Sequence, residues 1–398
     1  MRSVGRWHRN YGRTLSGFRN VSSSSSSSSG KGASGKGSSK AGTTSTTKEA
    51  ETHAHHTPKA PAAPRRINIS DIHRMTKRGV PISVLTAYDY PSAVHADLAQ
   101  IDMVLVGDSV AMVELGCETT QSVTMEEMLH HTKAVMRGAR RSLVIADMPF
   151  GSYQLNPEEA MRNAYRFIKE TGVGGVKMEG GVAIKESVRR VVQGGIAVLG
   201  HTGLLPASVS AIGQYRSFGK NAKEAIAITE DALALQDAGA FGIVLECVPE
   251  RVAQFVTDKL DIPTIGIGAG QGTSGQVLVY HDVLGMLQHP HHAKVTPKFV
   301  KRYAGCAEFI QEGLEMYKRE VKSRSFPSKE YCPYEIPDKE WEMLVGHFAN
   351  TALVMPPRDL IKNKTSLTKA KGKARITPRK APKSKTPIPE DEPPLSVY

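Results

Sequence analysis

The chain has 398 residues, of which 52 are Lys or Arg and 39 are Asp or Glu, for a formal net charge of +13. The excess lies at the ends: residues 1–66 contain 12 basic and 2 acidic residues, and residues 357–398 contain 11 and 4. The segment between them is slightly acidic, so we expect no nucleic-acid partner for it, although the basic tails leave a polyanionic partner open. No apolar run reaches the roughly 18 residues of a membrane helix, which predicts a soluble protein.

Residues 1–66 have the composition of a targeting segment followed by a linker. The first 20 residues contain five arginines, and no acidic residue precedes Glu49. An Arg-rich, Ser-rich, acid-poor and amphipathic start is typical of a mitochondrial transit peptide, which predicts location in the matrix; an ordinary basic tail is the alternative. The serine run at 22–29 and the Gly/Ser/Lys-rich stretch after it cannot bury a core, so we expect disorder there.

Apolar runs typical of buried strands alternate with helical segments over residues 67–350, the predicted catalytic domain. The expected strands are Ile82–Tyr88, Met103–Gly107, Ser142–Ala146, Gly175–Met178, Ala197–Gly200, Phe241–Leu245, Thr264–Ile267 and Gln276–Val279. Buried parallel strands have such continuous apolar runs, and eight strand–helix units predict an α/β fold of the (β/α)8 barrel type. A doubly wound sheet is the alternative, but it usually has a Gly-rich loop after its first strand, where this chain has Asp89-Tyr90-Pro91.

Helix signals separate these strands. Thr124, Asn156 and Asn221 occupy predicted N-cap positions, and Gly138, Gly172 and Gly239 stand at the corresponding ends. Ser70 predicts a short leading helix that closes one end of the barrel. Residues 297–350 are expected to form helices packed outside the barrel, and the Lys/Pro-rich residues 357–398 a second disordered tail.

Several of the expected strands end in charged residues, and the C-terminal ends of barrel strands meet at one mouth. Asp108 and Asp147 follow neighbouring strands, and two close carboxylates repel unless a cation lies between them. Oxygen ligands without His or Cys favour Mg²⁺ over zinc, so both are candidate metal ligands. The alternative is that each aspartate caps the helix that follows it.

Other charged residues extend this pattern. Lys177 and Glu179 are two apart on a strand and therefore face the same side. They either form a structural ion pair, or Lys177 binds a substrate carboxylate and Glu179 supports the metal. Glu246 ends an apolar strand, and a carboxylate in that position is suited to act as a general base. The alternative is a surface glutamate at a strand end. His201 ends the fifth strand and is either structural or catalytic.

Eight ordered segments resemble the ketopantoate hydroxymethyltransferase (3-methyl-2-oxobutanoate hydroxymethyltransferase) family over about residues 67–330. They are TAYDYPSA (86–93), MVLVGDS (103–109), ADMPFGSY (146–153), VKMEGG (176–181), GHTGLLP (200–206), VLECVP (244–249), PTIGIGAG (263–270) and HDVLG (281–285). The resemblance implies a (β/α)8 fold of the phosphoenolpyruvate-mutase type, Mg²⁺ and a homodecamer. The chain departs from the family at Gln121-Ser122, where Leu-Pro is usual.

The resemblance also implies an activity. The family transfers a hydroxymethyl group from the co-substrate 5,10-methylenetetrahydrofolate to 3-methyl-2-oxobutanoate, giving ketopantoate (2-dehydropantoate) in the first step of pantothenate biosynthesis. Chelation of the keto acid by Mg²⁺ stabilises the enolate formed when C3 loses a proton. The implied roles are metal and substrate binding for Asp108 and Asp147, metal support for Glu179, substrate binding for Ser109, Lys177 and His201, and proton abstraction for Glu246.

Two other functions are compatible with parts of this pattern. An isocitrate-lyase or phosphonopyruvate-type enzyme also forms Mg²⁺-bound enolates, but its KKCGH signature is absent. The second is a non-enzymatic protein whose basic tails bind an anionic partner. The inward-facing charges argue against it, because without a role they would destabilise the barrel.

Overall fold

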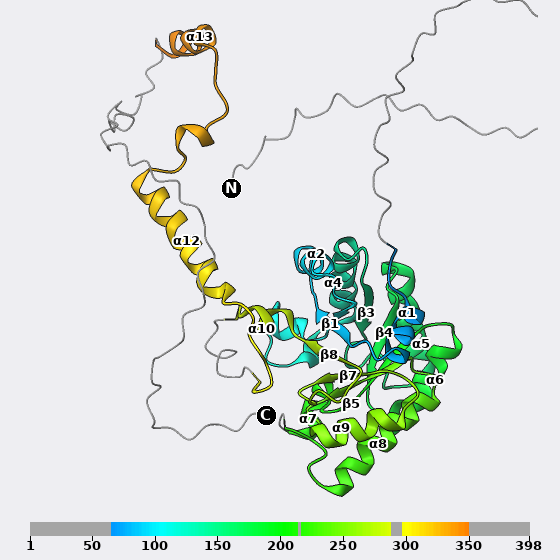
Figure 1. The fold of residues 1–398 in the computed structure, drawn as a ribbon. Coiled ribbons are helices and arrows are strands. Elements are labelled where there is room, and N and C mark those ends of the chain that lie inside the picture. The colour runs from blue at the N-terminus through cyan, green and yellow to red at the C-terminus, as the bar shows by residue number, and fades with distance from the viewer. Residues whose placement is uncertain (1–64, 214–215, 288–296, 350–398) are drawn as a thin grey trace, which may run out of the picture. The chain divides into compact units, whose positions relative to one another are not determined.

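The computed structural model describes residues 65–213, 216–287 and 297–349, and its centre is a closed barrel of eight parallel strands (Figure 1). The strands are β1 (Ile82–Thr86), β2 (Met103–Val106), β3 (Leu143–Asp147), β4 (Gly175–Glu179), β5 (Val198–Gly203), β6 (Gly242–Glu246), β7 (Thr264–Ile267) and β8 (Gly275–Leu278). Each strand pairs with its neighbour in sequence, and β8 pairs with β1. The predicted (β/α)8 barrel and its strands are therefore confirmed, and the open sheet is excluded.

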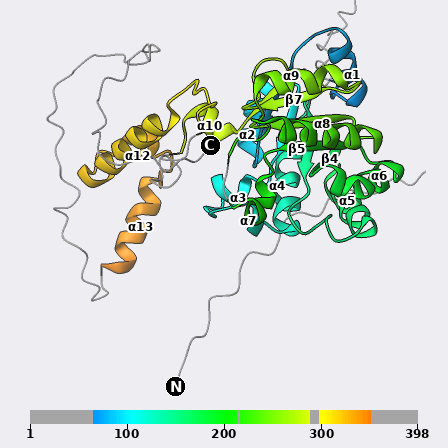
Figure 2. The same ribbon diagram turned by 90° about the horizontal axis from the view of Figure 1, so that it is seen from below.

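The helices are α1 (Ile69–Lys77), α2 (Tyr90–Leu98), α3 (Val110–Val113), α4 (Met125–Gly138), α5 (Pro157–Thr171), α6 (Lys185–Gln193), α7 (Val209–Ile212), α8 (Ala222–Asp237), α9 (Glu250–Lys259), α10 (Tyr280–Leu284), α12 (Cys306–Ser323) and α13 (Asp338–Phe348). Several of them lie around the outside of the barrel, among them α4, α5, α6, α8 and α9 (Figures 1 and 2). The predicted caps Thr124, Asn156 and Asn221 each accept a hydrogen bond from the backbone N–H three residues later.

One predicted helix start is wrong, whereas the predicted glycines stand at the helix ends. Helix α1 is capped by Asn68 rather than Ser70, because the side chains of Asn68 and Asp71 each accept the other's backbone N–H in a capping box. Helix α8 ends as predicted: its last residue is Asp237, its C-cap is Ala238, and Gly239 follows with a positive φ of 97°. Gly138 ends α4, and it also permits close packing: a Cβ there would lie 2.6 Å from the carbonyl oxygen of Tyr90.

Two apolar clusters hold the barrel together. One fills its interior and includes Leu105, Ile145 and Leu199, and the other lies between the strands and the surrounding helices. Ile72 of α1 is 1% exposed and belongs to the interior cluster. Helix α1 therefore covers one end of the barrel, whereas α3 and α7 follow the C-terminal ends of β2 and β5 (Figure 2).

The C-terminal helices differ from the expectation of packing outside the barrel. Ala307, in the first turn of α12, is buried and donates its N–H to the carbonyl of Gly285 after α10. From Glu308 to its end α12 is exposed, and α13 has no buried residue. No helix in the described ranges is long and apolar enough to cross a membrane. The predicted transit peptide and both predicted disordered tails lie outside the described residues, apart from Arg65 and Arg66.

Candidate active site

A cavity of about 170 Å³ lies at the C-terminal ends of the strands. All of the predicted site residues line it, which confirms that the strand ends converge: they are Asp108, Ser109, Asp147, Lys177, Glu179, His201 and Glu246. The geometry follows from the parallel barrel, since each strand delivers its last residues to the same mouth.

The aspartates and the lysine form one connected group. Lys177 Nζ donates to Asp147 Oδ2 at 2.6 Å, and the backbone N–H of Asp108 donates to the same oxygen at 3.1 Å. Lys177 therefore pairs with Asp147 on the neighbouring strand rather than with Glu179. Burial alone would lower the pKa of Lys177, but Asp147, Asp108 and Glu179 together raise it above its usual value, so the side chain is an ammonium ion.

Glu179, His201 and Glu246 form a second group on β4, β5 and β6. His201 lies between the two carboxylates, with Nδ1 3.5 Å from Glu179 Oε2 and Nε2 3.4 Å from Glu246 Oε2. At these separations neither contact is a closed hydrogen bond, and neither ring nitrogen has a hydrogen-bond partner among the described residues. Glu179 Oε1 accepts the backbone N–H of Ala207 at 2.6 Å.

Negative charge exceeds positive charge in this cavity. Burial, followed by the nearby Asp147 and Glu246, raises the pKa of Asp108 to about 7 against the opposing effect of Lys177. Burial and Asp108 raise the pKa of Glu179 well above its usual value. Five carboxyl groups, those of Asp108, Asp147, Glu179, Glu246 and Asp282, therefore line a cavity with one ammonium ion, and an added cation would relieve their repulsion.

The donor set fits a hard divalent cation. Asp147 Oδ1 is buried and has no hydrogen-bond partner among the described residues, although a carboxylate oxygen there requires one. The described residues contain no cluster of three or more His, Cys, Asp or Glu side chains that could hold a metal by themselves. Carboxylate oxygens completed by water and substrate oxygens are the usual shell of Mg²⁺, so Asp108 and Asp147 are the residues that could hold it.

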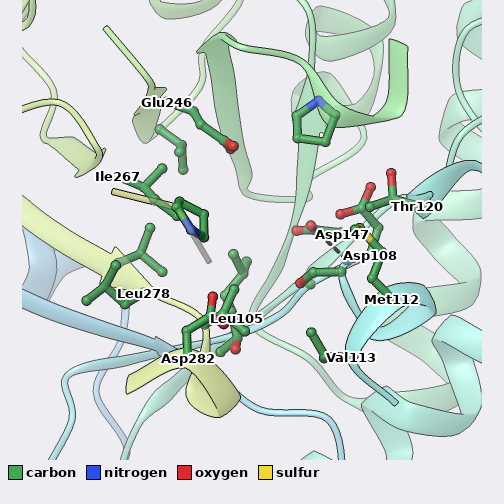
Figure 3. A pocket seen from close by; sticks show the side chains of 18 of the residues that line it. Leu105, Asp108, Met112, Val113, Thr120, Asp147, Glu246, Ile267, Leu278 and Asp282 are labelled. Atoms are coloured by element: carbon green, nitrogen blue, oxygen red, sulfur yellow. Dashed lines mark hydrogen bonds between the residues drawn. The ribbon is translucent and has the colours of Figure 1, made fainter. Parts of the chain in front are cut away.

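Much of the remaining cavity wall is apolar, although Thr86 and Asp282 also line it. It includes Val113, Ile267, Leu278, Phe299 and Val300. Figure 3 shows Asp108, Asp147 and Thr120 gathered on one side, while the carboxylate of Glu246 points into the cavity from another strand. A small ligand with one anionic end and one aliphatic end would match both parts of this cavity.

The structure adds residues that the sequence patterns did not single out. Tyr88 is fully buried and its hydroxyl lies 2.8 Å from Ser109 Oγ, so it fixes that side chain. Thr120 lines the cavity, is 2% exposed, and its Oγ1 has no hydrogen-bond partner in the described part of the chain. Tyr88 lies in the segment TAYDYPSA (86–93), which begins at the end of the first strand, so its position at the mouth could have been predicted. Thr120 lies in a loop whose sequence has no recognisable pattern.

Similarity to solved structures is distant. A phosphoenolpyruvate phosphomutase from Streptomyces platensis subsp. rosaceus matches with a TM-score of 0.45 and 14% identity, covering 70% of this chain and 96% of that one. A phosphonopyruvate hydrolase complexed with oxalate and Mg²⁺ matches with a TM-score of 0.45 and 11% identity, covering 72% and 99%.

Similarity in sequence is much closer. An Arabidopsis thaliana protein named 3-methyl-2-oxobutanoate hydroxymethyltransferase 1, mitochondrial, is 50% identical over 284 residues, covering 71% of this chain and 82% of that protein. The protein of Carboxydothermus hydrogenoformans named 3-methyl-2-oxobutanoate hydroxymethyltransferase is 52% identical over 266 residues, covering 67% and 95%. The sequence model of ketopantoate hydroxymethyltransferase matches residues 66–329. The chain therefore belongs to the ketopantoate hydroxymethyltransferase family of enzymes.

Proposed function

We propose that this enzyme transfers a hydroxymethyl group from 5,10-methylenetetrahydrofolate to 3-methyl-2-oxobutanoate, giving ketopantoate for the first step of pantothenate synthesis. The observation that carries the proposal is the convergence of Asp108, Asp147, Lys177 and Glu246 on one cavity. Family membership supports the same activity. The reaction needs a cation-binding site, a partner for a carboxylate and an acceptor for a proton, and these residues provide all three.

The proposed cofactor is Mg²⁺, held by Asp108 and Asp147 with Glu179 in or just behind the metal shell. The buried, unpartnered Oδ1 of Asp147 and the crowding of carboxylates support this assignment. Bound there, Mg²⁺ would polarise the keto group and so make the C3 proton of the substrate more acidic.

The chain's own side chains bind and orient the keto acid. The ammonium ion of Lys177 and the Ser109 hydroxyl bind its carboxylate, and Tyr88 holds Ser109 in place. The isopropyl group contacts the apolar wall, which also excludes water. Each interaction matches one chemical group of 3-methyl-2-oxobutanoate, so the cavity selects a small branched keto acid.

Glu246 accepts the proton from C3. Its carboxylate points into the cavity, and Nε2 of His201 lies 3.4 Å from one of its oxygens. The carbon left by this proton then forms the new C–C bond to the one-carbon unit, whose bonds to the two folate nitrogens break in the course of the transfer. One water molecule supplies the hydroxyl oxygen of the product, and tetrahydrofolate leaves. A base at this position contributes about 10²–10⁴-fold to the rate of such a proton transfer.

The test is product formation by the purified chain. Incubation with 3-methyl-2-oxobutanoate, 5,10-methylenetetrahydrofolate and Mg²⁺ should yield ketopantoate, detected by mass spectrometry, and chelation of Mg²⁺ by EDTA should stop the reaction. Isocitrate and phosphonopyruvate serve as control substrates. Cleavage of either one without ketopantoate formation would instead support a lyase or hydrolase.

We infer a mitochondrial location for this enzyme. The arginine-rich, acid-free first 20 residues support it, as do the names of the plant relatives, which include the word mitochondrial. Residues 1–60 fused to a fluorescent protein should direct it to mitochondria, and replacement of the five arginines by glutamine should abolish import. A diffuse cytosolic signal from the unaltered fusion would contradict the inference.

We also infer that several copies of the chain assemble, as the family resemblance implies. Helix α12 exposes an apolar stripe along one face, defined by Ile310, Leu314, Tyr317 and Val321. Exposed apolar surface of this kind is typical of protein–protein contacts, and a second copy of the chain is the proposed occupant.

A further inference from the structure

Two loops of the barrel mouth are joined by one side chain. The loop after β2 contains a 3₁₀ helix, η1 (Thr120–Ser122), and the loop after β5 contains another, η3 (Pro206–Ser208). Gln121 of η1 donates from Nε2 to the carbonyl oxygen of Ala207 at 2.8 Å and to Ser210 Oγ at 3.0 Å. Its amide therefore links strand-end loops that are far apart in sequence.

The same Ala207 also contacts the site. Its backbone N–H donates to Glu179 Oε1 at 2.6 Å, and the residue is 2% exposed. Ala207 is therefore held by Gln121 through its carbonyl and itself holds Glu179 through its amide. A shift of the η3 loop would change the orientation of the Glu179 carboxylate.

Gln121 has a similar effect on its own loop. The preceding residue, Thr120, turns its side chain into the cavity, where Figure 3 shows it beside Asp108 and Asp147. Its buried hydroxyl closes no hydrogen bond of good geometry among the described residues, but it faces the Asp108 carboxyl group and helps to lower the pKa of that group, so its place bears on a proposed metal ligand. The bond from Gln121 to Ala207 fixes η1 and therefore the place of this hydroxyl.

We propose that Gln121 is a positioning residue that clamps η1 to η3 and thereby sets the orientation of Glu179 and Thr120 around the bound cation and substrate. The inference rests on the proposed function for the ligands, whereas the clamp itself rests only on the hydrogen bonds. Outer partners of metal-binding carboxylates commonly alter metal affinity by about 10–100-fold. Gln121 lies one step further out, so the lower end of that range is expected.

The clamp is tested with two substitutions that remove its donor. Gln121→Glu keeps the size of the side chain but places an acceptor against the Ala207 carbonyl, and Gln121→Leu removes the polar group. The matched control is Gln254→Leu on α9, which loses a 2.8 Å hydrogen bond to Asp258 outside the cavity. Ser210→Ala removes only the hydroxyl that accepts the second bond from Gln121 and leaves the bond to Ala207. It should therefore change hydrogen exchange and Mg²⁺ binding by less than about twofold, which is smaller than the effect of one ordinary hydrogen bond.

The first measurement is amide hydrogen exchange of the metal-free protein. Both Gln121 variants lose the bond to the Ala207 carbonyl, and this loss should speed exchange at the Ala207 amide about fivefold, the effect of one ordinary hydrogen bond. The second is the Mg²⁺ dissociation constant by calorimetry, expected to rise about tenfold in these variants and to stay unchanged in Gln254→Leu. Unchanged thermal melting shows that the barrel is intact.

Faster exchange together with weaker Mg²⁺ binding supports the proposal. Unaltered exchange at Ala207 overturns it, because the loops are then held without Gln121. Faster exchange with unaltered Mg²⁺ binding also overturns it, because the clamp then does not act on the site. If the unsubstituted protein binds no Mg²⁺, the proposed function fails, and the exchange measurement alone still decides whether the clamp exists.

Discussion

Asp147 connects the lysine and the second aspartate of the site: one of its oxygens accepts from Lys177 and from the backbone of Asp108, while the other has no partner among the described residues. Lys177 neutralises only part of the surrounding negative charge. The unpartnered oxygen of Asp147 and the remaining negative charge together explain why the site suits a bound cation, in addition to the buried ion pair between Lys177 and Asp147.

Replacement of Asp147 tests this assignment. Asp147→Asn should raise the Mg²⁺ dissociation constant by roughly 100-fold or more, since even the loss of an outer partner costs about 10–100-fold. Excess Mg²⁺ should restore activity only in part, because the substitution also removes the partner of the Lys177 ammonium ion. Asp108→Asn should behave similarly.

Asp231→Asn is the matched control, because Asp231 accepts the N–H of Val182 and does not line the cavity. Its Mg²⁺ affinity should equal that of the unsubstituted protein, measured by calorimetry for every variant. Unchanged affinity in both Asp147→Asn and Asp108→Asn would mean that these aspartates only organise the strand ends.

Residues at strand ends could be predicted from the sequence, and residues in the loops could not. Glu246 ends a continuous apolar run, so its position at the mouth follows once the strands are recognised. Gln121 and Thr120 act through a loop whose path depends on Ala207, which is 86 residues further along the chain than Gln121. Such contacts have no periodicity, so nothing in the local sequence indicates them.

At the scale of elements, helix starts are encoded locally. The Thr124 hydroxyl accepts the N–H of Glu127, and the Glu127 carboxylate accepts the N–H of Thr124. These bonds involve residues only three apart, which is why α4 could be predicted. The exposed C-terminal helices could not be placed, because an apolar stripe shows that a partner is needed but not whether it is the barrel or another copy.

The capping box of α4 provides a stability prediction. Thr124→Ala should lower the free energy of unfolding by about 1 kcal/mol, because an N–H in the first turn loses its acceptor. The control is Ser328→Ala, at an N-cap whose side chain makes no capping bond. Urea denaturation followed by circular dichroism measures both, and equal stabilities for Thr124→Ala and Ser328→Ala would show that the box contributes nothing.

At the scale of the whole molecule, charge and exposed apolar surface are distributed separately. The basic excess lies in the terminal segments, whereas the barrel region has slightly more acidic than basic residues. The apolar stripe of α12 is the feature of the described chain that most needs a partner, because Leu314 is 60% exposed and Tyr317 is 57% exposed. Burial of such side chains contributes about 1.5–3 kcal/mol each, enough in sum to favour assembly.

Light scattering coupled to gel filtration tests the assembly. The unsubstituted chain of 43.2 kDa should elute with a mass several times that value. Leu314→Glu should lower the mass, because it places a charge in the stripe, whereas Arg319→Glu on the opposite face of α12 should not. A monomeric mass for the unsubstituted chain would contradict the inference.

The central claim is that the barrel mouth removes the C3 proton of a keto acid through Glu246, and isotope exchange tests it most directly. With Mg²⁺ in D₂O and without folate, the unsubstituted enzyme should exchange the C3 proton of 3-methyl-2-oxobutanoate, monitored by NMR. Glu246→Gln should slow this exchange by about 10²–10⁴-fold, while the surface control Glu170→Gln should exchange at the original rate. Exchange by Glu246→Gln at the rate of the unsubstituted enzyme would contradict the account and make His201 the next candidate base.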